Sequence, residues 1–128
     1  LDRLDLSLHT SLMPHLVRRF VDMGAPAEMG DQGCAEDKIS AIEYIDDQVI
    51  GPVVEALENA DVEFRMLIMP DHPTPVRVRT HTSDPVPYMI YDSTNPVQGK
   101  DSYSEKTGQE TGIFIEKGYT LIDHLLEK

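Results

Sequence analysis

The residues of this chain best suited to chemistry are an aspartate and two histidines that follow an apolar segment. Asp71 and His72 come directly after the run 62–69, and His81 follows a little further along. In α/β proteins, ligands bind at the carboxyl ends of the strands, so a strand over 62–69 would place Asp71 and His72 at such an end. The stiff Pro-Thr-Pro segment 73–75 could turn the chain and return His81 to the same place.

The combination of these side chains is typical of a metal site. Imidazole nitrogens with carboxylate oxygens suit zinc or manganese, whereas sites made only of oxygens suit magnesium. Asp71, His72 and His81 could serve one ion, or they could be divided between two neighbouring ions. The simpler alternative is that the aspartate caps a turn and both histidines are exposed loop residues, because isolated Asp-His pairs are common.

Longer motifs around these residues resemble the cofactor-independent phosphoglycerate mutases of the archaeal type, a branch of the alkaline-phosphatase superfamily. The segments Ile-Met-Pro-Asp-His-Pro-Thr-Pro at 68–75 and Arg-Thr-His-Thr-Ser-Asp-Pro-Val-Pro-Tyr at 79–88 are similar to the C-terminal signature of that family. Shorter similarities occur in the same order along the chain, at residues 25–33, 38–46, 104–106 and 118–121. The resemblance runs from about Phe20 to the end.

This resemblance implies an α/β fold, with a partial alkaline-phosphatase-like sheet and flanking helices, that binds two divalent ions. Asp71 and His72 would ligate one ion and His81 the other. The ions would be manganese or zinc, with magnesium as a further option. The family interconverts 2- and 3-phosphoglycerate in glycolysis through a serine nucleophile, and its metals offset phosphoryl charge and activate that serine.

The chain departs from the family motif Ala-Pro-Asp-Glu-x-Gly-His, whose aspartate and histidine are metal ligands. Ala27 replaces the aspartate and Asp31 replaces the histidine. An alanine cannot bind a metal, but Asp31 could supply an oxygen, so it is the fourth candidate ligand. The family's serine nucleophile lies far toward the N-terminus. We therefore expect the catalytic serine outside this chain, and a single, incomplete metalloenzyme-superfamily domain over 1–128.

Three functions fit these observations. The first is a piece of a phosphoglycerate mutase-like isomerase that is inactive alone. The second is a degenerate, non-catalytic domain that acts as a structural or interaction module, which Ala27 favours. The third is a phosphatase of the same superfamily. Because an incomplete sheet leaves a strand edge and apolar surface uncovered, we also expect self-association or pairing with the missing N-terminal segment.

Composition restricts the partners further. With 23 acidic and 11 basic residues, the net charge is −12, which disfavours nucleic acid and anionic membranes because both bind through Lys and Arg. A phosphorylated small molecule remains compatible if a metal supplies the positive charge. The lone Cys34 cannot form an internal disulfide and is interpreted as a spectator, and the sequence has no apolar run long enough for a membrane span. We expect a cytoplasmic protein.

Hydrophobic periodicity and turn residues predict the elements that position these side chains. Pro52 is expected to kink or break the longest helix near Gly51. The strand over 62–69 is expected to be buried on both faces of a sheet. The expected elements are a helix at 10–23, a loop at 24–34, a helix at 35–58, a strand at 62–69, a short strand or extended segment at 76–79, a strand at 86–91, a loop at 92–112 and a short amphipathic helix at 119–126.

Overall fold

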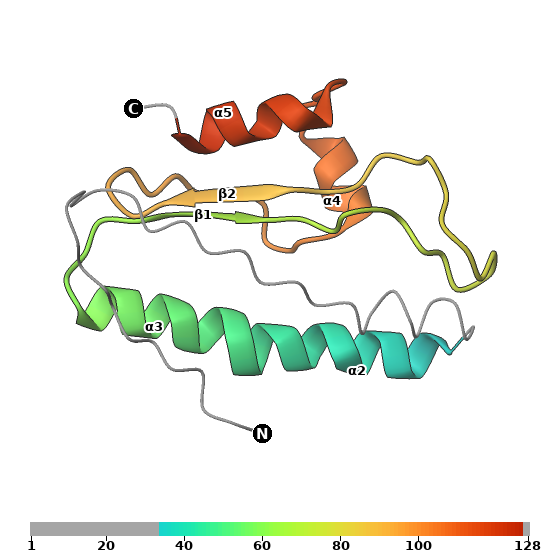
Figure 1. Ribbon diagram of the computed structural model, residues 1–128, viewed down its shortest axis with the longest axis horizontal. Coiled ribbons are helices and arrows are strands. Elements are labelled where there is room, and N and C mark those ends of the chain that lie inside the picture. The colour runs from blue at the N-terminus through green and yellow to red at the C-terminus, as the bar shows by residue number, and fades with distance from the viewer. Residues whose placement is uncertain (1–33, 127–128) are drawn as a thin grey trace.

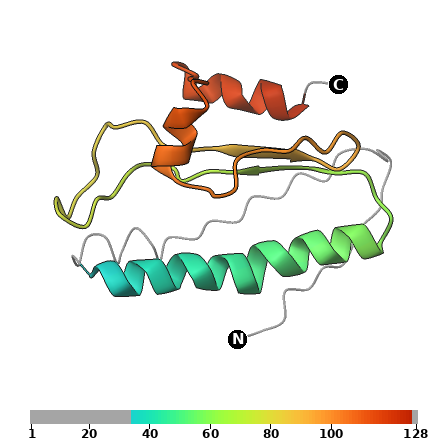
Figure 2. The same ribbon diagram turned by 180° about the vertical axis from the view of Figure 1, so that it is seen from behind.

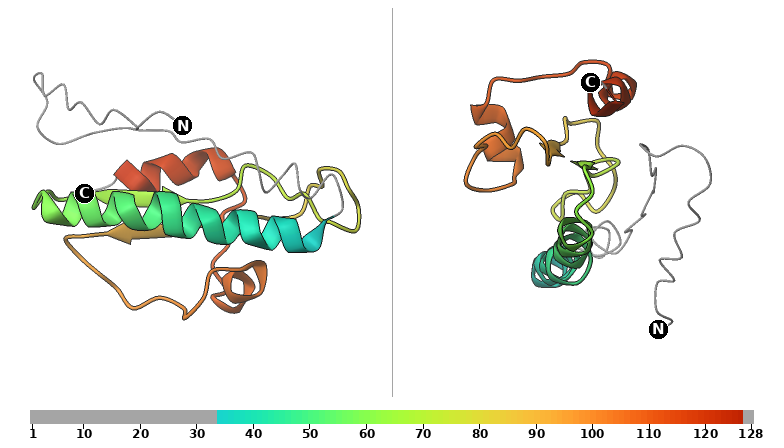
Figure 3. Two further views of the ribbon diagram at one scale, coloured as in Figure 1. Left: turned by 90° about the horizontal axis from the view of Figure 1, so that it is seen from below. Right: turned by 90° about the vertical axis from the view of Figure 1, so that its left-hand side faces the viewer.

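Residues 34–126 of the computed structural model are described, and they place a small sheet between helices (Figure 1). The helices α2 and α3 run along one side of the sheet, and α5 runs along the other side (Figure 3). The elements are α2 (Ala35–Ile45), a π-helical turn (Asp46–Ile50), α3 (Gly51–Asn59), β1 (Arg65–Ile68), β2 (Met89–Asp92), α4 (Glu105–Glu110), a 3₁₀ turn (Gly118–Thr120) and α5 (Leu121–Leu126). The predicted helix at 10–23, most of the predicted loop at 24–34 and the candidate ligand Asp31 lie outside the described residues.

The helix predicted over 35–58 is confirmed, and its predicted irregularity takes the form of a π-helical turn. The backbone N–H of Gly51 donates to the carbonyl of Asp46, five residues earlier. Pro52 begins the next helical segment and has no N–H to donate. A β-carbon at position 51 would lie 3.3 Å from the Asp46 oxygen, so glycine relieves crowding in this turn. The helix therefore continues through the proline instead of ending there.

The two strands pair antiparallel as a two-stranded sheet. Their register places Arg65 opposite Asp92 and Ile68 opposite Met89. Both strands are shorter than predicted, and β2 starts only after Pro87, which cannot donate to a ladder. The expectation that the first strand is buried on both faces was wrong, because Arg65 is exposed and the rest of β1 is half-buried. Among residues 34–126, no third strand pairs with β1 or β2.

The segment predicted as a short strand at 76–79 is instead a tight turn. The backbone N–H groups of Val78 and Arg79 both donate to the carbonyl of Pro75, at 2.9 Å and 3.0 Å. Arg79 adopts a left-handed conformation with φ of 56°, which few residues with a side chain accept. The alternating valines and arginines predicted a strand, but in the described part of the chain this segment pairs with no other strand.

The predicted loop at 92–112 contains a helix, α4, and in this respect the prediction was wrong. Ser104 caps the helix, because its hydroxyl accepts a hydrogen bond from the backbone N–H of Thr107 at 3.2 Å. The Thr107 hydroxyl in turn lies 3.0 Å from the backbone N–H of Ser104. This reciprocal capping satisfies two N–H groups that a helix start leaves unpaired. The helix α4 lies near the end of the sheet where β2 begins, and the chain continues from α4 to α5 (Figure 2).

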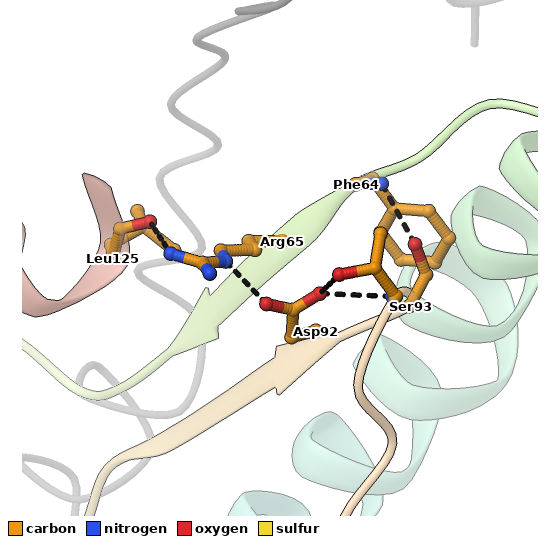
Figure 4. Close-up of polar contacts among 6 residues, drawn as sticks. Phe64, Arg65, Asp92, Ser93 and Leu125 are labelled. Carbon is orange, nitrogen blue, oxygen red and sulfur yellow. Dashed lines mark hydrogen bonds and ion pairs between the residues drawn. The ribbon is translucent and has the colours of Figure 1, made fainter. Parts of the chain in front are cut away.

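The predicted C-terminal helix is confirmed as α5, and one arginine ties it to the sheet. The Arg65 side chain bonds to Asp92 on β2 and to the backbone carbonyl of Leu125 on α5 (Figure 4). Leu121 of α5 is the one buried apolar residue among those described, with 4% of its surface exposed. Within residues 34–126, none of the helices combines the length and the apolar character that crossing a bilayer requires. The observed fold is thus a mixed helix-and-sheet arrangement with a very small core.

Candidate functional site

The candidate site is a loop, residues 70–82, that leaves the end of β1 and lies near the start of α2 (Figure 1). The turn at Pro75 reverses the chain. A backbone hydrogen bond of 3.1 Å from Thr82 to Pro73 then holds the two arms of the loop together. This closure confirms the expectation that the proline-rich segment returns His81 toward His72. We call residues 70–82 the metal loop.

The closed loop brings three of the four candidate ligands together. The imidazole rings of His72 and His81 are stacked, with their centroids 3.5 Å apart and their planes inclined by 28°. One carboxylate oxygen of Asp71 lies 3.1 Å from Nε2 of His72. The other accepts a 2.9 Å hydrogen bond from the His72 backbone N–H. Because Asp71 is largely exposed and His72 is partly exposed, small ions can reach this cluster from solvent.

Two further residues, Thr74 and Lys38, hydrogen-bond within or to this loop, and the sequence did not predict either contact. Thr74 is buried, with 4% of its surface exposed, and its hydroxyl lies 3.3 Å from Nδ1 of His72. The backbone carbonyl of Thr74 accepts a 2.7 Å hydrogen bond from Nζ of Lys38 on α2. The Pro-Thr-Pro setting of Thr74 marked a rigid turn in the sequence. No pattern in the sequence connected Lys38 to that turn.

The chemistry of the gathered donors fits a divalent metal. Two imidazoles and a carboxylate form the mixed nitrogen and oxygen set that zinc and manganese accept. The two rings, however, stack face against face. Across residues 34–126, no three side chains of His, Cys, Asp or Glu form a group that could hold an ion. The described residues thus bring three candidate ligands close together but do not form a complete metal site.

Other charged or reactive side chains lie outside this cluster. Arg77 and Arg79 are exposed on the outer turn of the metal loop. Cys34 immediately precedes α2 at the helix start, as predicted, and its side chain makes no capping hydrogen bond. His124 is exposed on α5. None of these residues adds a ligand to the His72 and His81 pair.

Comparison with known proteins extends this picture. The sequence model of the Metalloenzyme superfamily matches residues 18–127. The chain is similar to 2,3-bisphosphoglycerate-independent phosphoglycerate mutases from Methanosarcina mazei, at 37% identity, and Methanothrix thermoacetophila, at 39% identity. It is also 36% identical to a probable enzyme of that name from Geobacter sulfurreducens.

The shared region is only part of each relative. The matches cover 84%, 84% and 85% of this chain but 28%, 27% and 27% of the three relatives. The chain therefore spans little more than a quarter of the length of these curated relatives. No solved structure matches the chain.

Proposed function

The chain belongs to the metalloenzyme superfamily, and from this premise we propose that it is one part of a metal-dependent phosphoglycerate mutase. The proposed reaction is the interconversion of 2- and 3-phosphoglycerate, an isomerase step of glycolysis in the cytoplasm. The names of the relatives and their 36–39% identity to this chain support it. The observation that carries it is the approach of His72 and His81, whose ring centroids are 3.5 Å apart with Asp71 beside them.

In this proposal the metal loop supplies some of the ligands of a divalent-metal centre. Asp71, His72 and His81 would hold the ion or ions, with manganese or zinc favoured by the mixed donor set. Asp31, which lies outside the described residues, is proposed as a further ligand. When bound, the metal would neutralise charge on the phosphoryl group of a phosphorylated small molecule. The role of the loop residues themselves would be to bind the metal and to hold it in a fixed position.

We further propose that the nucleophile and the remaining ligands come from segments outside this chain, so that the chain alone is inactive. Its two-stranded sheet would then be one part of a larger, alkaline-phosphatase-like sheet. Exposed apolar side chains support this proposal, because soluble domains rarely leave many of them uncovered on one element. On α2 these are Ile39, Ile42 and Tyr44, which are 56%, 50% and 62% exposed. Pairing with the missing segment, or with a second copy, would cover them.

The test is a metal titration of the full chain, followed by its melting temperature. A ligand that binds only the folded state stabilises it by about 2.7 kcal/mol when its concentration is 100 times its Kd. Zinc or manganese should therefore raise the melting temperature of the unmodified chain. His72→Asn and His81→Asn should abolish that rise, whereas His124→Asn on α5 should leave it in place.

Two results would overturn parts of the proposal. If millimolar zinc and manganese leave the melting temperature of the unmodified chain unchanged, Asp71, His72 and His81 do not bind a metal without ligands from other segments. If the purified chain with manganese converts 3-phosphoglycerate to 2-phosphoglycerate at a robust rate, no outside segment is needed. In that second case the proposed metal site would be retained, and the proposal that the chain alone is inactive would be wrong.

A further inference from the structure

We propose that Lys38 is a positioning residue of the metal loop: its ammonium group fixes Thr74, and Thr74 orients the ring of His72. This inference rests on the proposed metal-binding function, which gives the orientation of His72 its purpose. It adds a residue from a separate element, α2, to a site whose candidate ligands all lie elsewhere. Two contacts connect Lys38 to His72 through Thr74.

The first contact is between Lys38 and the carbonyl of Thr74. At 2.7 Å, it has the short length of a charge-assisted hydrogen bond. Lys38 lies close to the N-terminus of α2, where the helix dipole disfavours a positive charge. Its partner in the described part of the chain is a backbone oxygen, not a carboxylate. The hydrogen bond to the Thr74 carbonyl therefore best explains why a half-buried lysine occupies this position.

The second contact is between the Thr74 hydroxyl and Nδ1 of His72, at 3.3 Å. Histidines that bind a metal through one ring nitrogen usually hydrogen-bond through the other, and this second bond sets the tautomer and the ring direction. With Nδ1 engaged by Thr74, the nitrogen left for an ion is Nε2, which here faces the carboxylate of Asp71. A hydroxyl can donate to Nδ1 or accept from it, so the Thr74 contact fixes the direction of the ring and keeps Nε2 on the side of Asp71. Without a metal, the Asp71 carboxylate, which can only accept, favours a proton on Nε2, and the Thr74 hydroxyl then donates to Nδ1.

The backbone around Thr74 is held from two sides, which makes this orientation rigid. The Thr74 carbonyl is held by Lys38, and the neighbouring Pro73 carbonyl is held by the N–H of Thr82. The Thr82 bond connects this segment to the arm that carries His81. Loss of the Lys38 bond would free one side of the segment, so the His72 ring would turn and its stack with His81 would loosen.

The experiment compares lysine variants of the full chain by NMR, without metal. The readouts are the nuclear Overhauser effects between the His72 and His81 rings and the ring-nitrogen shifts that report the His72 tautomer. Lys38→Met keeps the aliphatic stem and removes the donor, and it should lose both the inter-ring signals and the tautomer preference. Lys38→Arg, which can still donate to the Thr74 carbonyl, should restore them. Lys106→Met, on the exposed face of α4, should resemble the unmodified chain.

Zinc affinity gives a second readout. Loss of a partner that orients a metal ligand typically weakens metal binding by about 10- to 100-fold, and this is the change expected for Lys38→Met. Unchanged ring spectra and unchanged zinc affinity in Lys38→Met would overturn the inference. If the unmodified chain binds no zinc, the loop does not bind this metal without ligands from other segments, and the metal-free ring spectra still decide the role of Lys38.

A variant that unfolds would be recognised by its far-ultraviolet circular dichroism, and Thr74 then provides the test. Thr74→Val preserves the shape of the side chain and removes the hydroxyl, so it should release the His72 tautomer. Thr74→Ser retains the hydroxyl and should preserve the tautomer. If Thr74→Val leaves the His72 ring spectra unchanged, the hydroxyl does not orient the ring and the inference is wrong.

Discussion

Arg65 on β1 and Asp92 on β2 face each other across the antiparallel ladder, and their side chains form a 2.5 Å hydrogen bond. The same guanidinium reaches the carbonyl of Leu125 on α5 at 3.5 Å. The other carboxylate oxygen of Asp92 accepts hydrogen bonds from the backbone N–H and the hydroxyl of Thr94, at 2.9 Å and 2.6 Å. One carboxylate thus organises the end of the sheet and, through Arg65, the last helix.

These contacts make stability depend on pH in the acid range. The hydroxyl and the N–H of Thr94, followed by Arg65, lower the pKa of Asp92 from 3.8 to about 2. Because the folded pKa lies below the ordinary value, the ionised carboxylate stabilises the fold above about pH 3.8, and this contribution is lost as the pH falls through about 2. Thr94→Val should raise the pKa of Asp92, as followed by ¹³C NMR of its carboxyl carbon. Thr94→Ser, which keeps the hydroxyl, should not, and an unmoved pKa in Thr94→Val would contradict the assignment.

Leu121 should be the most sensitive apolar position of the described part. It is 4% exposed and lies at the start of α5. Replacing a buried leucine by alanine costs about 2–5 kcal/mol in well-packed cores, and we expect a value near the lower end because this core is small. Urea denaturation measures the change. The neighbouring Ile122, at 41% exposure, is the control, and Ile122→Ala should cost clearly less. Equal losses would show that burial of Leu121 does not stabilise the fold.

Features set by local periodicity were predictable from the sequence. The spacing of isoleucines and valines fixed the helix over 35–58, and Pro52 located its irregularity at the π-helical turn. In the sequence, Asp71 and His72 come directly after a predicted strand, and the prolines of segment 73–75 predicted that His81 returns toward them. These inferences depended on neighbours along the chain, where spacing and steric limits decide the outcome.

Features set by distant or weak local signals were not predictable. The antiparallel register of β1 and β2 joins segments with no sequence cue to their pairing. The helix α4 is short and contains Gly108, so its propensity is poor and its cap decides its existence. Arg79 has a positive φ that an alternating pattern cannot reveal. The bond from Lys38 to Thr74 spans 36 positions, and only the folded chain brings them together.

Gly112 should tolerate a side chain poorly, although the space around it is open. It follows α4 with φ of 68°, and a β-carbon there would meet nothing within 4 Å. The left-handed conformation costs a residue with a β-carbon about 1–2 kcal/mol, so Gly112→Ala should lower the free energy of unfolding by roughly that amount. Gly118 has equally open surroundings without the positive φ. Gly118→Ala is therefore the control, and a loss of stability as large as that of Gly112→Ala would contradict the explanation.

The apolar face of α2 should drive association of the isolated chain. Ile39 and Ile42 lie three residues apart, which places them on one side of the helix, and both are at least half exposed. If the chain is one part of a larger domain, light scattering should show a molecular mass that rises with concentration. The double variant Ile39→Ser with Ile42→Ser should reduce this association, because it removes the apolar surface that the partner would cover. Serine at Glu55 and Glu58, which are exposed at the same spacing on α3, should leave it unchanged. A monomer at every concentration with cooperative unfolding would show that residues 1–128 form a complete domain, and the proposal of an incomplete one would fail.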